Sequence, residues 1–451
     1  MTGRRVVVVG GGLAGVTAAL QCADAGCEVT LLEAKPWLGG LTYSFRRGEL
    51  SVDNGQHVFL RCCDRYLAFL DRLGVADQVT MQPRLDVPVR SARSGATARL
   101  QRSGLPAPLH LARSLARYRL LSPRERLGIV TAALAMRSVD PDDPSTDEQS
   151  FGSWLAAKGQ SPRSVEALWE LIGIATLNAR ADQASLALAA TVFQQGLLDR
   201  ADAGDVGWAT VPLGRLHGEA MSAALATAGV QVHSRRRVIG VDSLPSGWSV
   251  RTGSEDVVAD AVVVAVPPPA AEQVLPEGVL GVPAGWAAAL GSAPIVNVHV
   301  VYDRQVLDEP FLAAVDSPVQ WVFDRTEQSG LRDGQYVALS LSAAQGIIDT
   351  RTAVLRDQLL PELARLLPQA ARAGVEEVFV TREREATFHP APGTARFRPA
   401  QQTAAPGLFV AGAWTATGWP ATMEGAVRSG EAAAAGLLAQ TTRPSTAGRA
   451  A

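Results

Sequence analysis

A short polar run in an apolar setting is the first feature of the sequence that suggests chemistry. The run is Asp53-Asn54-Gly55-Gln56-His57, and apolar residues flank it on both sides. A histidine exchanges protons near neutral pH, and a neighbouring carboxylate orients its ring and raises its basicity. His57, Asp53 and Gln56 are therefore candidate catalytic residues. A polar turn of the Asx type, with the histidine merely hydrogen-bonded, explains the same run, so both interpretations stay open at this point.

A glycine-rich segment near the N-terminus has the pattern of a dinucleotide-binding turn. The β-branched run 6–9 predicts a buried strand, Gly10, Gly12 and Gly15 give the spacing G-x-G-x-x-G, and the alanine- and leucine-rich run that follows predicts a helix as far as residue 25. A second apolar strand ends at Glu33, whose carboxylate can accept hydrogen bonds from ribose hydroxyls. A plain strand-to-helix turn explains glycines alone, but strand, helix and acid occur here in register. The residues expected at the dinucleotide are Gly10, Gly12, Leu13, Ala14, Gly15, Glu33, Ala34 and Lys35.

Composition limits the kinds of protein to consider. The 451 residues are 47% hydrophobic and 19% charged, enough for a large core and for two or three domains. A net charge of −2 gives no general attraction to nucleic acid. The four cysteines have neither the spacing of a metal site nor the density of a disulfide framework. Since no run of about 18 apolar residues occurs either, we expect a cytoplasmic protein without a metal.

Three further segments complete a larger pattern: a Gly-Gly turn at 38–41, a strand at 407–412 that ends in glycine, and a helix that opens at Thr422. Together with the glycine fingerprint they resemble the FAD-dependent amine oxidase and phytoene desaturase superfamily, which implies FAD as the cofactor. Two positions depart from that pattern, because Leu41 stands where arginine is usual and Ala413 where an acidic residue is usual. The further FAD contacts that the resemblance implies are Gly39, Gly40, Leu41, Gly55, Gln56, Val238, Gly412, Ala413, Thr422 and Met423.

The resemblance also predicts the architecture. The expected fold class is α/β, with a Rossmann-like FAD-binding domain into which a mixed sheet-plus-helix substrate domain is inserted. The FAD-binding domain is expected from three separated segments, 1–62, 206–268 and 401–440. The substrate domain is expected from two, a helical segment at 63–205 and a second at 269–400. A disordered tail is expected at 441–451.

Amine oxidation, a common reaction in that superfamily, is not favoured by the sequence. The resemblance places a lysine near the flavin N5 atom and an aromatic residue just before a Met-Glu-Gly-Ala segment. The sequence has only two lysines, Lys35 beside the ribose acid and Lys158 in a polar stretch, and Thr422 occupies the aromatic position. These three positions count against an amine substrate.

Four segments in a fixed order are similar to the hydroxysqualene dehydroxylase family, also called squalene-associated FAD-dependent desaturases. They are DNGQH at 53–57, PIVNVH at 294–299, PVQWVFDR at 318–325 and WTATGWPAT at 414–422. The resemblance implies that reduced flavin replaces the allylic hydroxyl of a C30 isoprenoid by hydrogen, in bacterial squalene and hopanoid biosynthesis, with His57 beside the flavin as proton donor. The substrate-lining residues expected are His299, Trp321, Phe323, Trp414 and Trp419. An ordinary core position is the alternative for each of these five.

A C30 hydrocarbon is held in a membrane, so a docking surface is expected. The stretch 105–130 interleaves leucines with arginines and is broken at Pro123. Such a basic amphipathic stretch suits the headgroup layer of an anionic leaflet, which predicts peripheral association with the inner membrane face. An ordinary surface helix with its apolar side on the core explains the same pattern.

Two other functions remain open on sequence grounds. One is a desaturase of a carotenoid-like or other prenyl substrate, which runs in the oxidative direction. The other is a degenerate flavoprotein that serves as a scaffold for neighbouring squalene-forming enzymes, an idea motivated by Leu41 and Ala413. FAD takes the glycine fingerprint at residues 10–15, so the sequence identifies no nicotinamide cofactor as electron donor.

Overall fold

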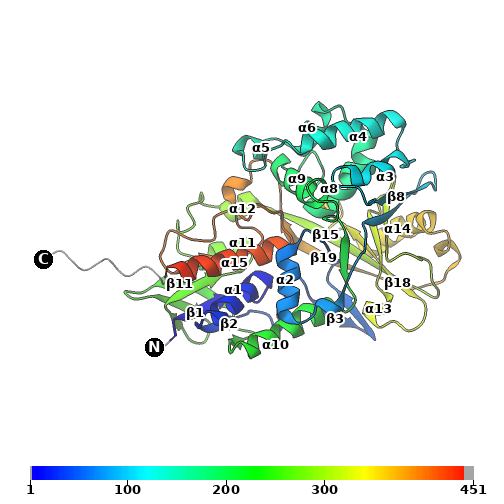
Figure 1. The fold of residues 1–451 in the computed structure, drawn as a ribbon. Helices are drawn as coiled ribbons and strands as arrows, with labels where there is room; N and C mark the ends of the chain where they lie inside the picture. Colours follow the sequence, from blue (N-terminus) through cyan, green and yellow to red (C-terminus); the bar gives the residue numbers. More distant parts are fainter. Residues whose placement is uncertain (1–2, 441–451) are drawn as a thin grey trace.

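The protein combines two large sheets of different kinds with three smaller sheets and a layer of helices. The computed structural model describes residues 3–440. A parallel sheet and the helices packed on it form one end of the molecule, at the left of Figure 1, and a larger, mostly antiparallel sheet forms the other end. Helices from the region 109–198 lie above the larger sheet in this view. The predicted α/β class is confirmed.

The parallel sheet is assembled from three separated parts of the chain. In spatial order its strands are β10 (Gln231–His233), β2 (Glu28–Leu32), β1 (Arg5–Val9), β14 (Ala261–Val264) and β20 (Leu408–Val410). The central β1 pairs with β2 on one side and with β14 on the other. Residues 6–9 are all buried because both faces of the sheet are covered: Val6 and Val8 belong to a core with several helices, and Val7 and Val9 belong to a second core that includes Val241 and Val250 of a small neighbouring sheet. Their sequence is therefore continuously apolar instead of alternating.

Two helices from opposite ends of the chain pack together on this sheet. They are α1 (Leu13–Asp24), which ends one residue before the predicted limit, and α15 (Met423–Ala439). Small residues allow the close contact, since a Cβ added to Gly430 would lie 2.3 Å from the Ala14 carbonyl oxygen. Helices α2 (Asp64–Leu73) and α10 (Ala220–Thr227) pack beside them.

The larger sheet has seven strands. In spatial order they are β19 (Val375–Phe388), β15 (Ser292–Tyr302), β18 (Gln335–Leu341), β17 (Trp321–Asp324), β16 (Phe311–Val315), β7 (Asp86–Ser91) and β8 (Thr97–Gln101). Val296, Val298 and Val300 on β15 belong to the core that includes α14 (Thr352–Leu366). Because side chains alternate along a strand, Asn297 and His299 face the other side of the sheet.

Short strands hold the polar run between the two large sheets. The hairpin of β3 (Ser44–Arg47) and β4 (Leu50–Asp53) precedes it. A three-stranded sheet follows it, made of β5 (Val58–Leu60), β9 (Val206–Ala209) and β6 (Val79–Met81). Val52 on β4 shares a small core with Val301 on β15, so the non-α14 face of the larger sheet lies against this hairpin. The polar run is thus fixed at both ends.

The helical layer and the outer elements complete the fold. The layer contains α3 (Ala112–Ala116), α4 (Pro123–Met136), α5 (Pro144–Glu148), α6 (Phe151–Ala157), α7 (Pro162–Ser164), α8 (Glu170–Leu177) and α9 (Leu186–Phe193). The break predicted at Pro123 is the start of α4, where Ser122 forms a capping box with Glu125. The outer elements are β11 (Val238–Ser243), β12 (Trp248–Thr252), β13 (Val257–Ala259), α11 (Pro268–Val274), α12 (Trp286–Leu290) and α13 (Thr326–Ser329).

Within residues 3–440, no helix has both the length and the apolar character needed to cross a bilayer. The domain boundaries given above stay a prediction, and the tail at 441–451 lies outside the described residues.

Candidate active site

The glycine-rich turn leads into α1 and leaves the first turn of that helix open. Gly12 is the N-cap, no side chain caps the helix, and no acidic residue lies in its first turn. Gly10 has a φ of 108°, and a Cβ on Gly15 would lie only 2.0 Å from the Gly10 carbonyl oxygen, so both positions require glycine. The N–H groups at this helix N-terminus, beginning with Leu13 and Ala14, suit the charge of a pyrophosphate.

A second glycine turn packs directly on the first. The Gly39 N–H donates to the Gly11 carbonyl at 2.9 Å, and a Cβ on Gly40 would lie 3.0 Å from the Gly12 Cα. Leu41 follows with 44% of its surface exposed. The two turns therefore form one backbone cradle, and the missing arginine at position 41 removes a side chain from its rim without altering the cradle itself.

The predicted ribose acid lies beside this cradle. The Glu33 carboxylate accepts from the Gly11 N–H at 2.6 Å and from the Lys35 N–H at 2.7 Å, and its remaining lone pairs are free for ribose hydroxyls. The Glu33 carbonyl accepts from the Arg236 N–H, which brings the start of β11, with buried Val238, to the same place. Ala34 and Lys35 are exposed.

The remaining predicted cofactor residues lie at the end of β20 and the start of α15. The Gly412 N–H donates to Ser429 Oγ at 2.8 Å, and Ala413 follows, half-buried. Thr422 caps α15 by accepting from the Gly425 N–H at 3.1 Å, and the next residue, Met423, is half-buried. Backbone N–H groups, helix N-termini and one carboxylate are the groups that a dinucleotide such as FAD needs, so these residues fit it.

A buried arginine that the sequence did not single out orders the neighbouring loop. The Arg398 guanidinium donates to the carbonyl oxygens of Thr415 and Trp419, both at 2.7 Å, and more weakly to those of Ala413 and Trp414. Burial lowers the pKa of Arg398 to about 10. Its charge is thus spread over backbone dipoles of the segment that follows Gly412, and no motif signals this role.

The polar run contains a buried ion pair. Asp53 accepts from Arg325 Nη2 and from Ser44 Oγ, both at 2.6 Å, and from the Leu213 N–H at 2.9 Å. The Asp53 and Arg325 side chains are only 5% and 10% exposed. Asp53 therefore binds Arg325 directly and acts on the neighbouring His57 through space, by its charge.

His57 is half-buried and is held by the turn itself. Its Nδ1 lies 3.2 Å from the Gly55 carbonyl, and because a carbonyl only accepts, Nδ1–H is the donor in this contact. Desolvation lowers the pKa of His57, although the Gly55 carbonyl and the charges of Asp53 and Glu383 oppose that shift. The ring is therefore neutral at pH 7, with Nε2 as a hydrogen-bond acceptor.

Two further residues beside the run were not predicted. Glu383 on β19 accepts from Tyr43 Oη and from Asn54 Nδ2, both at 3.1 Å. Burial and this carboxylate raise the pKa of Tyr43 to about 12, so the phenol keeps its proton. Glu383 is 329 residues from Asn54 in the chain, and its position in a charged strand segment gives no sequence signal of this contact.

His299, predicted at the substrate, is fully buried with both ring nitrogens hydrogen-bonded. Nδ1 lies 2.7 Å from Tyr336 Oη and Nε2 lies 3.0 Å from Thr381 Oγ1, while the ring stacks on Phe379 at 4.5 Å between centroids. Burial lowers the pKa of His299 to about 3. The imidazole is a neutral support for the strand pair β15 and β19 in this arrangement.

Two of the predicted aromatic residues belong to a cluster beside the polar run. Trp321 and Phe323 stack at 6.1 Å between centroids, and both lie near Phe311, which is in edge contact with Trp208. Trp208 pairs with Val58, the residue that directly follows His57. The cluster is therefore a largely buried apolar group adjoining a hydrogen-bonding turn, with Phe311 and Phe323 in the core and Trp208 and Trp321 partly buried against it.

The other two predicted aromatics lie elsewhere. Trp414 stacks on Trp286 at 5.0 Å, and its Nε1 donates to the Val266 carbonyl at 3.0 Å. Trp419 is buried, with the Arg428 guanidinium 4.9 Å from its ring centroid. Both flank the loop that Arg398 orders.

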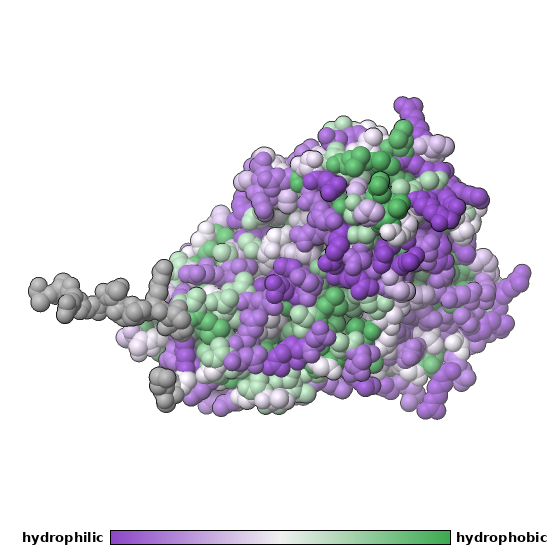
Figure 2. Space-filling model, in the orientation of Figure 1, coloured by the Kyte–Doolittle hydropathy of each residue, from purple (hydrophilic) through white to green (hydrophobic). Residues whose placement is uncertain are grey.

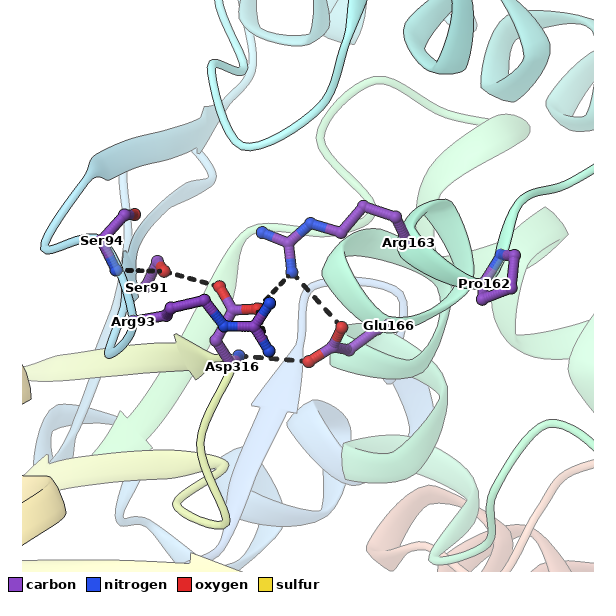
Figure 3. Close-up of a pocket in the computed structure, with 7 residues that line it drawn as sticks. All are labelled: Ser91, Arg93, Ser94, Pro162, Arg163, Glu166 and Asp316. Carbon is purple, nitrogen blue, oxygen red and sulfur yellow. Dashed lines mark hydrogen bonds and ion pairs between the residues drawn. The ribbon is translucent and has the colours of Figure 1, made fainter.

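A pocket of 350 Å³ lies apart from these residues, between the β7–β8 turn and the helical layer (Figure 3). Arg163 Nη1 lies 2.7 Å from Asp316 Oδ1 and 3.3 Å from Glu166, so its charges largely neutralise one another. This shallow polar site suits neither a flavin nor a hydrocarbon. Its lining residues are Ser91, Arg93, Ser94, Pro162, Arg163, Glu166 and Asp316.

The lysines and the metal-ligating residue types occupy surface or dispersed positions. Lys35 and Lys158 are both exposed, and Lys158 lies over the Trp154 ring. Between residues 3 and 440, no three His, Cys, Asp or Glu side chains form a group that could hold a metal ion. The four cysteines are free thiols.

Comparisons with known proteins agree with this geometry. A hydroxysqualene dehydroxylase of Rhodopseudomonas palustris is 28% identical over 445 residues, covering 97% of this chain and 99% of the relative. A zeta-carotene desaturase of Synechocystis is 24% identical over 494 residues, covering 98% and 99%. Among solved structures, the cyclohexylamine oxidase of Brevibacterium oxydans has the same fold, with a TM-score of 0.73 at 19% identity, covering 98% of this chain and 100% of that one.

The family follows from a match that spans nearly the whole chain. The profile of the flavin-containing amine oxidoreductases matches residues 13–438, from the start of α1 to the last turn of α15. The predicted FAD cofactor and oxidoreductase activity are thereby confirmed. The protein is a member of the flavin-containing amine oxidoreductase family.

Proposed function

We propose that this protein uses reduced FAD to replace the allylic hydroxyl of hydroxysqualene by hydrogen, which yields squalene for hopanoid biosynthesis. The observation that carries the proposal is the aromatic cluster of Trp208, Phe311, Trp321 and Phe323, which adjoins the turn that holds His57. An apolar wall beside hydrogen-bonding groups suits a long hydrocarbon with one polar atom. The two relatives named for isoprenoid substrates support the same class.

The overall change breaks a C–O bond, forms a C–H bond and releases water, consuming two electrons and two protons. FAD, when bound, supplies the electrons as a hydride equivalent. The residues of the chain then have three tasks: to orient the alcohol, to shield the allylic carbon from water, and to stabilise positive charge as the C–O bond weakens. Trp321 and Phe323 suit the last task, because aromatic faces attract cations. His57, whose pKa is lowered by burial, suits the delivery of the second proton to the oxygen that leaves as water, because a protonated imidazole with a lowered pKa is a stronger acid.

One anaerobic experiment tests the proposal. The purified protein is reconstituted with FAD, reduced, and mixed with hydroxysqualene in detergent, and both flavin reoxidation and the extracted lipid are followed. We expect reoxidation together with squalene. The variant His57→Ala is expected to retain flavin and lose turnover. If this variant turns over as fast as wild type, the run 53–57 has only the structural role of a turn.

A prenyl desaturase is the second candidate, and the zeta-carotene desaturase relative favours it. Oxidised flavin would then be bleached by a carotenoid-like hydrocarbon, and reduced flavin would persist with hydroxysqualene. A scaffold without activity would instead purify colourless and stay so with added FAD, so the same preparation separates all three functions.

We also propose that the surface around α4 docks on an anionic membrane. Ile129, Ala132 and Met136 face the core, yet α4 carries a second apolar row on its outer side. Figure 2 shows hydrophobic surface in the part of the molecule where Figure 1 places α4. The outer row is Leu127, Val130 and Leu134, which are 66%, 41% and 51% exposed, with Leu105 and Leu109 also exposed nearby in the chain.

Charge favours a lipid surface as the occupant of this apolar row. Four exposed arginines lie on the same part of the chain and would face anionic headgroups. They are Arg113, Arg117, Arg119 and Arg124.

Vesicle pelleting tests the docking surface. The triple variant Leu127→Ser, Val130→Ser, Leu134→Ser is expected to bind phosphatidylglycerol vesicles at least about tenfold more weakly than wild type, because it removes three apolar side chains that would be buried in the bilayer. The double variant Ile239→Ser, Leu244→Ser is the control. Ile239 and Leu244 are also exposed, at 51% and 38%, so this variant should bind the vesicles as wild type does. Equal binding by both variants would exclude this surface.

A further inference from the structure

Two buried amide atoms of residues beside Gly55 lack a hydrogen-bond partner. Within residues 3–440, six buried side-chain polar atoms have none, and two of these atoms, Gln56 Nε2 and Asn297 Oδ1, belong to residues that adjoin Gly55. Asn297 is fully buried, at 0% exposure. Leaving such a group unpaired is costly, and unpaired groups in native proteins often mark a functional site.

The orientation of Asn297 is fixed by its neighbour. Its Nδ2 donates to the Asn54 carbonyl at 3.2 Å, and because a carbonyl accepts only, Oδ1 is the atom left without a partner. The same Nδ2 would lie 3.7 Å from a Cβ on Gly55, and the His57 ring would lie 3.4 Å from that Cβ. Gln56 and Asn297 therefore lie beside the same glycine: Gln56 is the next residue in the chain, and Asn297 approaches it from β15.

The two unpaired atoms are complementary to an alcohol. A hydroxyl offers one donor and two lone pairs, so its O–H matches Asn297 Oδ1 and its oxygen matches a Gln56 Nε2 hydrogen. A hydrocarbon offers neither a donor nor an acceptor and would leave Asn297 Oδ1 and Gln56 Nε2 without partners. The aromatic cluster, which reaches the run through Trp208 and Val58, would receive the carbon chain of the same molecule.

We propose that Gln56 and Asn297 together bind the hydroxyl of the isoprenoid alcohol and let the site distinguish this substrate from the hydrocarbon product. This inference rests on the proposed dehydroxylation. It assigns a substrate-binding role to Asn297 and gives Gln56 the role of donor to the oxygen that leaves as water. Loss of that hydroxyl on turnover removes both hydrogen bonds, which favours release of the product.

Equilibrium binding without turnover tests the pair. Radiolabelled hydroxysqualene and radiolabelled squalene are each titrated into the oxidised holoenzyme at one fixed detergent concentration. We expect wild type to bind the alcohol at least about tenfold more tightly than the hydrocarbon, as two hydrogen bonds to buried groups imply. Asn297→Ala and Gln56→Ala should each reduce this preference to less than about threefold while squalene affinity stays unchanged.

Thr381→Val is the matched control. Thr381 Oγ1 donates to the same Asn54 carbonyl at 3.1 Å and lies 3.0 Å from His299 Nε2, so this variant removes one hydrogen bond from the loop and one from His299 but leaves both amides in place. The preference for the alcohol should survive in it. If it disappears there as well, or if wild type binds both ligands equally, the assignment of the pair is wrong.

The anaerobic turnover assay separates this inference from the proposed function. Squalene formation by an enzyme with no preference for the alcohol would overturn the pair and leave the function standing. A preference that depends on both amides, without squalene formation, would overturn the dehydroxylation and leave an alcohol-binding site. Should Asn297→Ala fail to fold, Gln56→Ala alone decides, because the Gln56 amide nitrogen bonds nothing in the fold.

Discussion

Replacing Arg325 by methionine should destabilise the protein strongly. Arg325 Nη2 lies 2.6 Å from Asp53 Oδ2, and both side chains are almost fully buried. After the replacement, the Asp53 carboxylate keeps only Ser44 Oγ and the Leu213 N–H, two neutral donors. Breaking one partner of a buried pair in this way costs about 3–5 kcal/mol, most of it from the unpaired charge.

A double-mutant cycle measured by urea unfolding tests this reasoning. Asp53→Asn in the Arg325→Met background removes the unpaired charge. The loss in free energy of unfolding of the double variant should therefore be about 2–4 kcal/mol smaller than the sum of the losses of the two single variants. Arg384→Met, which breaks the exposed pair with Asp349, is the control and should cost less than about 1 kcal/mol. If Arg325→Met lowers the free energy of unfolding by less than about 1 kcal/mol, or if the two single losses are additive, the buried Asp53 carboxylate does not depend on Arg325.

Two further predictions concern α15. Gly430→Ala should lower the free energy of unfolding by about 1–3 kcal/mol, because the new methyl group meets the Ala14 carbonyl oxygen, whereas Gly128→Ala on α4 has room and should be neutral or stabilising in the same urea titration. Burial raises the pKa of Glu424 from 4.5 to about 7, so the folded state holds this proton more tightly than the unfolded chain does, and stability should fall as pH rises from about 4.5 to 7. Glu424→Gln should flatten that part of the profile of melting temperature against pH, and an unchanged slope would contradict the assignment.

The sequence predicted the cofactor side of the molecule because its signals are local. Gly10, Gly12 and Glu33 lie within one strand–helix–strand unit, where glycine spacing and apolar runs directly reflect backbone geometry. The fold class and the FAD cofactor are confirmed. The stretch 105–130 was also placed at the surface by its pattern, and its membrane role stays a prediction.

The substrate side was much less accessible to sequence reasoning. Asn297 and Glu383 reach the polar run across more than two hundred residues of chain. Asn297 lies inside the PIVNVH segment, but nothing in the type or spacing of either residue indicated this contact. Arg325 lay inside a recognised motif, yet nothing in its spacing showed that it would pair with Asp53. Contacts of this kind depend on how two sheets meet, which neither periodicity nor turn chemistry encodes.

The order of strands in the parallel sheet has a consequence for how the protein is made. β1 is synthesised first, but β14, its partner on one side, follows some 250 residues later, and β20 joins only at residue 408. Helix α15, which covers α1, is later still. A nascent chain therefore carries the apolar surface of α1 without its cover until residues 423–439 have been synthesised, and such surfaces invite aggregation. Heterologous production should accordingly benefit from slow translation or from abundant chaperones that bind nascent chains.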